Sequence, residues 1–205
     1  MTRTHVFDAN TDRYDQWFVR HDADYFSELA AVRRLLPQRG LGLEIGVGTG
    51  RFASALGIPI GLDPCGNMLR RARDRDLLAV RGVAEALPFR AEVFDYALIV
   101  TTICFVDDAV GTLEEASRIL RPHGKVIVGF IDRESSIGRD YFARQSESVF
   151  YREATFYSPS EVEALLQTTG YTELRWVQTL FHWPSEAPTI DEPRSGCGEG
   201  GFVAV

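Results

Sequence analysis

Leu43-Glu44-Ile45-Gly46-Val47-Gly48-Thr49-Gly50-Arg51-Phe52 is the stretch that decides the fold. The apolar run that leads into it, residues 41–45, predicts a buried parallel strand, and a helical pattern begins after the last glycine. Three alternating glycines stand between the two. Glycine is needed where a backbone turns tightly after a strand and lies against a ligand with no Cβ in the way. The stretch therefore predicts a strand-to-helix turn that holds a nucleotide-like cofactor.

The spacing of the glycines narrows the choice of cofactor. A dinucleotide fingerprint, G-x-G-x-x-G, requires a third glycine where Arg51 stands, and a P-loop requires a lysine and a hydroxyl residue that do not follow Gly50. What remains is an acidic residue, Glu44, followed by G-x-G-x-G. This pattern resembles the first motif of the class I S-adenosylmethionine-dependent methyltransferases. Taken alone, the motif also fits a purely structural glycine turn or an unusual dinucleotide site.

A second apolar run, residues 58–62, ends at Asp63. A carboxylate at the tip of a strand can accept two hydrogen bonds from a ribose diol. Alternatively Asp63 only starts a turn, since Pro64 follows and Asp-Pro is common turn chemistry. The sequence Gly-Leu-Asp-Pro-x-x-x-Met-Leu again resembles the methyltransferase family, in which the acid binds the ribose hydroxyls and the next residues border the adenine.

Three further segments resemble the family in the family's own order, so the resemblance spans about residues 41 to 130. They are 82–89, similar to the segment that meets the adenine, 94–100, similar to the fourth strand, and 120–129, similar to the L-[KR]-P-G-G turn and fifth strand. The chain departs from the family at Val83, where an adenine-binding aspartate is frequent, and at His123, where the turn has its first glycine. The cofactor-binding residues that the resemblance implies are Glu44, Gly46, Gly48, Gly50, Asp63, Pro64, Met68, Ala84, Glu85, Thr101 and Thr102.

Strand and helix patterns alternate, which predicts right-handed crossovers and a parallel sheet covered on both faces. The expected strands are 41–46, 58–63, 77–81, 94–100, 124–130, about 172–180 and 200–205, and residues 184–201 are expected to form a loop. Ser158-Pro159-Ser160-Glu161 predicts a capping box that starts a late helix. The resemblance implies a Rossmann-like three-layer α/β sandwich whose mostly parallel seven-stranded sheet has an antiparallel last strand. With 205 residues, we expect a single domain over 1–205.

Two aromatic-rich segments flank these motifs. Residues 1–40 resemble the helical amino-terminal lid of small-molecule methyltransferases, although helices packed on the sheet would give the same pattern. Residues 132–157 are longer than a plain connection needs, which is typical of a segment that covers an active site or of a flap that only seals the core. The acceptor-binding candidates in and beside these segments are Tyr14, Trp17, Phe105 and Tyr141.

The sequence after the fourth strand assigns no catalytic residue. S-adenosylmethionine carries its own leaving group, so the protein must mainly align the acceptor and exclude water, and a general base is optional. Thr101-Thr102-Ile103-Cys104 lacks the [DN]-P-P-[YF] motif of enzymes that methylate exocyclic or amide nitrogens. It also lacks the aspartate of magnesium-dependent catechol-type enzymes, and no histidine stands at 104 or 105.

The composition excludes several classes of protein. The net charge of −7, from 22 basic and 29 acidic residues, disfavours nucleic-acid binding, and the arginines of 70–75 alternate with acids as on a solvated helix face. No apolar run approaches the roughly 20 residues that span a membrane, and residues 1–5 lack the apolar core of a secretion signal. Three distant cysteines and four histidines show no metal-ligand spacing. We therefore expect a cytoplasmic protein with no metal, no nucleic acid and no membrane partner.

These expectations combine into a methyltransferase that uses S-adenosyl-L-methionine, releases S-adenosyl-L-homocysteine and acts on a small molecule. The alternatives are a regulatory or scaffold protein that binds the cofactor without turnover, a protein or RNA methyltransferase and, last, a dehydrogenase. The sequence predicts neither the acceptor nor the oligomeric state.

Overall fold

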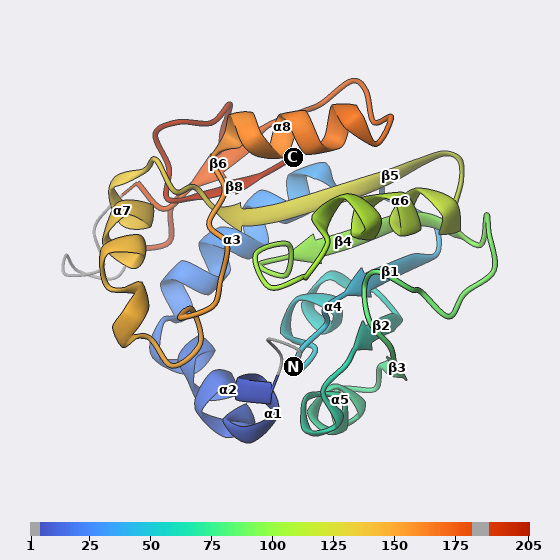
Figure 1. The fold of residues 1–205 in the computed structure, drawn as a ribbon, viewed down its shortest axis with the longest axis horizontal. Helices are drawn as coiled ribbons and strands as arrows, with labels where there is room; N and C mark the ends of the chain where they lie inside the picture. The colour runs from blue at the N-terminus through green and yellow to red at the C-terminus, as the bar shows by residue number, and fades with distance from the viewer. Residues whose placement is uncertain (1–4, 182–188) are drawn as a thin grey trace.

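The computed structural model describes residues 5–181 and 189–205, and within them eight strands form one sheet in the order β3-β2-β1-β4-β5-β8-β6-β7 (Figure 1). The strands are β1 (Gly42–Ile45), β2 (Ile60–Asp63), β3 (Leu78–Arg81), β4 (Phe94–Val100), β5 (Leu120–Ile131), β6 (Val177–Thr179), β7 (Arg194–Ser195) and β8 (Phe202–Ala204). Strands β1 to β5 pair in parallel, whereas β8 runs antiparallel to both β5 and β6. The mostly parallel sheet with an antiparallel last strand is confirmed.

The predicted count of seven strands is one too low. Strand β7 pairs with β6 through only two residues, and it lies inside the stretch 184–201 that was expected to be a loop. A two-residue strand has no alternation to detect, so its partner alone defines it. Strand β6 is also shorter than the predicted 172–180. Residues 184–188 of the expected loop lie outside the described part of the chain.

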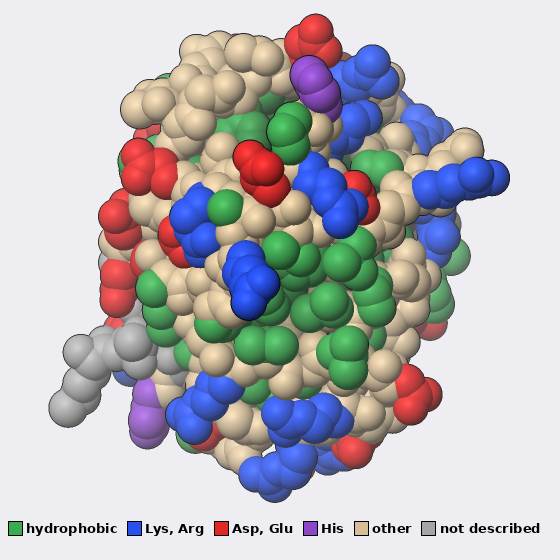
Figure 2. Space-filling view, turned by 90° about the vertical axis from the view of Figure 1, so that its right-hand side faces the viewer, with side chains coloured by type: hydrophobic (Ala, Val, Ile, Leu, Met, Phe, Trp, Pro, Cys, Tyr) green, Lys and Arg blue, Asp and Glu red, His purple; other side chains and the backbone are tan. Residues whose placement is uncertain are grey.

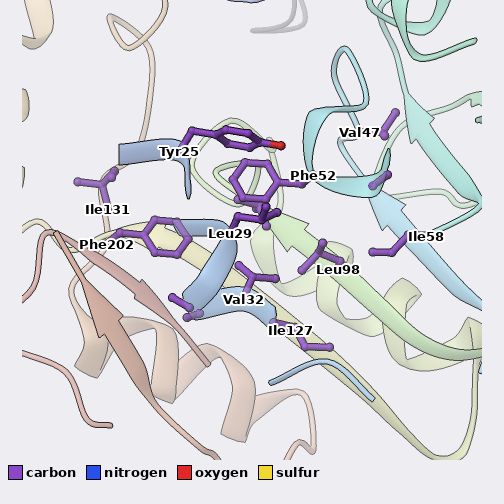
Figure 3. Packing of buried hydrophobic residues seen from close by; sticks show 14 of the residues in the cluster. Tyr25, Leu29, Val32, Val47, Phe52, Ile58, Leu98, Ile127, Ile131 and Phe202 are labelled. Carbon is purple, nitrogen blue, oxygen red and sulfur yellow. The ribbon is translucent and has the colours of Figure 1, made fainter. Parts of the chain in front are cut away.

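Helices cover both faces of the sheet and make three layers. One face carries α3 (Asp22–Leu35), α4 (Arg51–Leu56) and α5 (Gly66–Arg73), and the other carries α6 (Ala109–Ile119) and α8 (Pro159–Thr168). Figure 3 shows how α3 seals its face: Tyr25, Leu29 and Val32 point toward Phe52 of α4 and Leu98 of β4. The two buried clusters, one on each face, confirm the three-layer sandwich.

Two local predictions concern the ends of helices and turns. The capping box at the start of α8 is present, since the Ser158 hydroxyl accepts from the Glu161 amide and the Glu161 carboxylate accepts from the Ser158 amide. His123 has a φ of +67°, a conformation that favours glycine, which accounts for the glycine that the family places there.

The remaining helices belong to the two aromatic-rich segments. Helices α1 (His5–Ala9) and α2 (Thr11–Arg20) precede α3, and α7 (Ser136–Ala143) with the short 3₁₀ helix η1 (Gln145–Glu147) lies between β5 and α8. In Figure 1, α2 and α7 lie at the left, the side toward which the arrows of β4 and β5 point. Both segments therefore lie at the carboxyl ends of the parallel strands, where ligands bind in folds of this class.

The opposite side of the molecule has a different surface. Figure 2 shows the side at the right of Figure 1, where hydrophobic side chains gather in the middle and basic side chains lie above and below them. Leu78, on the edge strand β3, is 66% exposed. No helix within residues 5–181 and 189–205 is long and apolar enough to cross a membrane.

Candidate active site

The glycine-rich turn leads from β1 into α4 through three left-handed residues. Gly46, Gly48 and Gly50 have φ values of +75°, +52° and +85°, which side-chain-bearing residues rarely adopt. A Cβ on Gly46 would overlap the Thr102 side chain, and a Cβ on Gly48 would lie 3.3 Å from the Tyr14 hydroxyl oxygen. The first two glycines therefore leave room at the carboxyl end of β1.

Gly50 and Glu44 lie behind this turn. A Cβ on Gly50 would lie 2.6 Å from Leu77 Cδ1, so this glycine permits close packing against the chain that follows α5. Glu44 is buried, and burial raises its pKa well above the usual value, although a hydrogen bond from the Ala53 amide in the first turn of α4 opposes that shift. Neither residue lines the cavity described below, so their positions indicate support of the turn.

Asp63 ends β2 and holds the turn from the other side. Its Oδ2 accepts a hydrogen bond from the Gly48 amide at 2.9 Å, and its Oδ1 accepts one from the Cys65 amide at 2.8 Å. The residue is 8% exposed, and burial raises the pKa of its carboxyl despite the two amides. The Cys65 side chain also hydrogen-bonds the carboxyl group. Since a carboxylate has about four acceptor positions, one remains for a hydroxyl group of a ligand in the cavity.

A residue other than glycine also has a left-handed backbone conformation, directly after the end of β4. Thr101 has a φ of +46°, and its amide donates to the Gly129 carbonyl at 2.7 Å. Such strain in a non-glycine residue clusters at functional sites. The Thr102 hydroxyl donates to the carbonyl oxygens of Val100 and Gly46, at 3.0 and 3.3 Å, and so links β4 to the glycine turn.

A cavity of about 460 Å³ lies over these strand ends. Nine of the eleven predicted cofactor-binding residues line it, the exceptions being Glu44 and Gly50, and so do all four acceptor-binding candidates. Glu85 lines it as well, and its carboxylate accepts a hydrogen bond from the Asp107 amide at 2.8 Å, which fixes the loop after β4. The structure therefore brings thirteen of the fifteen predicted residues into one cavity.

Aromatic rings from four parts of the chain enclose the other half of the cavity. Phe7 of α1 lies 4.8 Å from Phe105 and 5.3 Å from Phe150, measured between ring centroids. Tyr151 stacks on Phe105 at 5.6 Å and meets Tyr141 edge-on at 5.3 Å. Both the amino-terminal helices and the 132–157 segment thus contribute walls.

A charged network fastens α2 to the glycine turn. Asp15 accepts from Arg51 at 2.7 Å, from Arg75 at 3.0 Å and from the Thr49 hydroxyl at 2.7 Å. Burial raises the pKa of Asp15, but the hydrogen bonds from Arg51 and Thr49 and the charge of Arg75 outweigh it and lower the pKa to about 2. The expectation that the arginines of 70–75 form only a solvated face is wrong for Arg75, whose side chain is 24% exposed.

Sequence reasoning missed several residues of the site. Phe7, Phe150 and Tyr151 line the cavity, and their aromatic-rich surroundings were the signal. Glu28 lines it too, is 5% exposed, and has its pKa raised to about 8 by burial and by the charge of Asp24. The available signal was its position three residues after Tyr25, on the apolar stripe of α3. Among the described residues, no group of three His, Cys, Asp or Glu side chains is arranged to hold a metal ion.

Comparison with known proteins identifies the family. Residues 43–128 match the family model described as a methyltransferase domain. The crystal structure of an S-adenosylmethionine-dependent methyltransferase from Thermotoga maritima, described as a possible histamine N-methyltransferase, is 48% identical with a TM-score of 0.96 over 98% of this chain and 97% of that one.

Two sequence relatives agree with this. An uncharacterized protein of Methanocaldococcus jannaschii is 41% identical over 98% of this chain and 97% of its own length. A demethylmenaquinone methyltransferase of Oceanobacillus iheyensis is 29% identical over 85% of this chain and 76% of its own. With the glycine turn and Asp63 joined at the ends of β1 and β2, the chain belongs to the class I S-adenosylmethionine-dependent methyltransferases.

Proposed function

We propose that this chain transfers a methyl group from S-adenosylmethionine to a small-molecule acceptor that binds in the same cavity. The observation that carries the proposal is the hydrogen bond between Gly48 and Asp63 on the wall of a cavity whose other half is lined by aromatic rings. A polar, glycine-shaped half suits the cofactor, and an apolar half suits an acceptor from which water is excluded.

The lining residues fit the cofactor both in their hydrogen-bonding groups and in the space that they leave for it. The remaining acceptor position of Asp63 suits a ribose hydroxyl, and the bare backbone at Gly48 permits close approach. Met68, Ala84 and Glu85 would border the adenine, with Pro64 beside them, and Thr101 and Thr102 would hold the methionine end. When bound, S-adenosylmethionine supplies a methyl group on a sulfonium whose thioether is a good leaving group. Glu44 and Gly50 would act by shaping the turn.

Three observations support a small acceptor. The cavity volume, about 460 Å³, is within the range of sites for metabolite-sized ligands. Helices α1 and α2 and the 132–157 segment line the cavity, so we assign them as a lid and a cover over the acceptor. The relatives from Thermotoga maritima and Oceanobacillus iheyensis are themselves named for small acceptors, histamine and demethylmenaquinone.

Transfer of a radioactive methyl group tests the proposal. The protein is incubated with methyl-labelled S-adenosylmethionine and with either the small-molecule or the macromolecular fraction of a cell extract. We expect label in small molecules only. Label in protein or RNA would contradict the proposal, and label in neither fraction, with the cofactor bound, would favour a regulatory protein without turnover.

A further inference from the structure

We propose that Glu28 binds the acceptor and accepts its proton, and that the acceptor is a small cationic amine; the assignment rests on the methyltransferase function proposed above. Glu28 is a carboxyl residue of the cavity that neither the family motifs nor the proposed cofactor contacts employ.

Glu28 is buried, and no residue in the described part of the chain pairs with it. It lies on α3 between Tyr25 and Leu29, which both face the core, and only 5% of the residue is exposed. None of the described residues donates a hydrogen bond or an ion pair to its carboxyl group, although its neighbour Ser27 is hydrogen-bonded to Ala23 at 2.7 Å. An unpaired buried carboxyl is costly unless it is protonated or meets a ligand. Because Glu28 lines the cavity, a ligand can supply the missing partner.

The groups around Glu28 suit a positive charge. Tyr14, Tyr141 and Tyr151 line the same cavity as Glu28, and its charge adds to burial in raising the pKa of each of the three phenols. Trp17 lines the same cavity. Aromatic faces attract ammonium groups, and they do so more strongly where water is excluded.

The other charges of the cavity also favour a cation. The ionisable acids that line it are Glu28, Asp63, Glu85 and Asp107, and the described lining contains no lysine, arginine or histidine. Asp63 and Glu85 already accept backbone amides, whereas Glu28 does not. Among the charged side chains of the described lining, an anionic acceptor would therefore meet only like charges, and a cationic amine would meet a carboxylate without a competing donor.

The proton accounting is consistent with this role. An ammonium ion has no lone pair, so one N–H proton must leave before the nitrogen can be methylated, and the Glu28 carboxylate receives it. Burial and Asp24 raise the pKa of Glu28 to about 8, closer to that of an alkylammonium group near 10. The free-energy cost of moving a proton from the ammonium group to the carboxylate is lowered accordingly. The nitrogen lone pair then forms the N–CH₃ bond while the S–CH₃ bond breaks and its electron pair stays on sulfur. The product is a methylated ammonium ion and a neutral thioether, and the Glu28 proton is released to water.

The proposal is tested by measuring the binding of three phenyl compounds of similar size that carry different end groups. Protein saturated with S-adenosylhomocysteine is titrated calorimetrically with 2-phenylethylamine, 2-phenylethanol and phenylacetate, which share a benzyl group and end in an ammonium, a hydroxyl and a carboxylate group. We expect the amine to bind about 10-fold or more tightly than the other two, as for a charge-assisted hydrogen bond. We expect Glu28→Gln to reduce this preference to within about twofold, whereas Glu114→Gln, an exposed residue of α6, retains it.

A second readout is the number of protons released, obtained by repeating the titration at pH 7 in buffers of different ionisation enthalpy. Since free Glu28 is mostly protonated at that pH, the amine should displace close to one proton from wild-type protein and none from Glu28→Gln. Equal affinity for amine and alcohol, a preference that survives Glu28→Gln, or no amine binding by protein that binds S-adenosylhomocysteine would overturn the proposal. Failure to bind S-adenosylhomocysteine would instead overturn the proposed function itself.

Discussion

The two halves of the cavity are built in different ways. The half we assign to the cofactor depends on backbone: Gly48 and Cys65 donate their amides to Asp63, and the three lie at the ends of adjacent parallel strands. The half we assign to the acceptor depends on side chains, namely rings from α1, α2 and the 132–157 segment together with Glu28 of α3. A backbone-built half can keep one ligand while the side-chain-built half changes its specificity. Changes in the two halves should therefore have separable effects.

The largest effect on stability is expected at Glu28. Its folded pKa, about 8, exceeds the ordinary value of 4.5, so between these pH values the folded protein holds a proton that the unfolded chain has lost. The wild type should thus lose stability as pH rises from about 5 to 9, by an amount on the order of a few kcal/mol. Urea unfolding of the ligand-free protein should show a smaller loss in Glu28→Gln, in which the buried Glu44 still contributes its own part, while Glu114→Gln follows the wild type. Parallel pH profiles for wild type and Glu28→Gln would contradict the burial of an unpaired acid.

The next effect concerns Asp15, which joins the acceptor half to the cofactor half. Its pKa is lowered to about 2, so its stabilisation is present above pH 4 and disappears as pH falls through 2. Asp15→Asn should lower the free energy of unfolding by about 2 kcal/mol at pH 7. Asp12→Asn is the matched control on the same helix, because Asp12 pairs with Arg71 at the surface and is 74% exposed. We expect that control to unfold like the wild type; equal losses in both variants would contradict the special role of Asp15.

Gly48→Ala should have a smaller effect on the free energy of unfolding, and it should also weaken the binding of S-adenosylhomocysteine. Alanine at a φ of +52° should cost about 1 kcal/mol, and its methyl group would lie beside Tyr14 within the cofactor half. Gly57→Ala has the matching strain, at a φ of +74°, but no neighbour within 4 Å. Both variants should be destabilised alike, and only Gly48→Ala should bind S-adenosylhomocysteine about 10-fold more weakly. Equal binding by the two variants would show that the turn does not meet the ligand.

The smallest effect should separate the halves most clearly. Phe150 lines the cavity and contacts Phe7 and Tyr14, whereas Phe142 of α7 is 56% exposed. In steady-state kinetics, Phe150→Ala should raise the KM for the acceptor a few-fold, in keeping with roughly 1 kcal/mol of ring contact, and leave S-adenosylhomocysteine binding unchanged. Phe142→Ala should alter neither value. A matching loss of cofactor affinity in Phe150→Ala would mean that the two halves are not independent.

The difference between a half built from backbone and a half built from side chains also explains which parts of the site could be predicted from the sequence. The glycine turn and Asp63 were predictable because they follow local backbone rules, namely tight turns and the shared edge of parallel strands. Glu28 was not, because a single acid in the apolar stripe of α3 reveals nothing until the cavity is formed. The Asp15 network joins residues 36 and 60 positions apart, and no local pattern encodes that distance. Strand β7 was missed for the same reason, since two residues become a strand only through their partner β6.

Calorimetric titration of S-adenosylhomocysteine into the wild type and two aspartate variants tests the central claim most directly. Asp63→Ala removes the acceptor of two backbone amides beside the cavity. Asp95→Ala removes an acceptor of the Leu41 amide and of Arg121 at the amino end of β4, away from the cavity lining. We predict that Asp63→Ala binds on the order of 100-fold more weakly, while Asp95→Ala binds within about twofold of the wild type once folding is verified by circular dichroism. Equal affinity in the wild type and Asp63→Ala would contradict the assignment of this cavity to the cofactor.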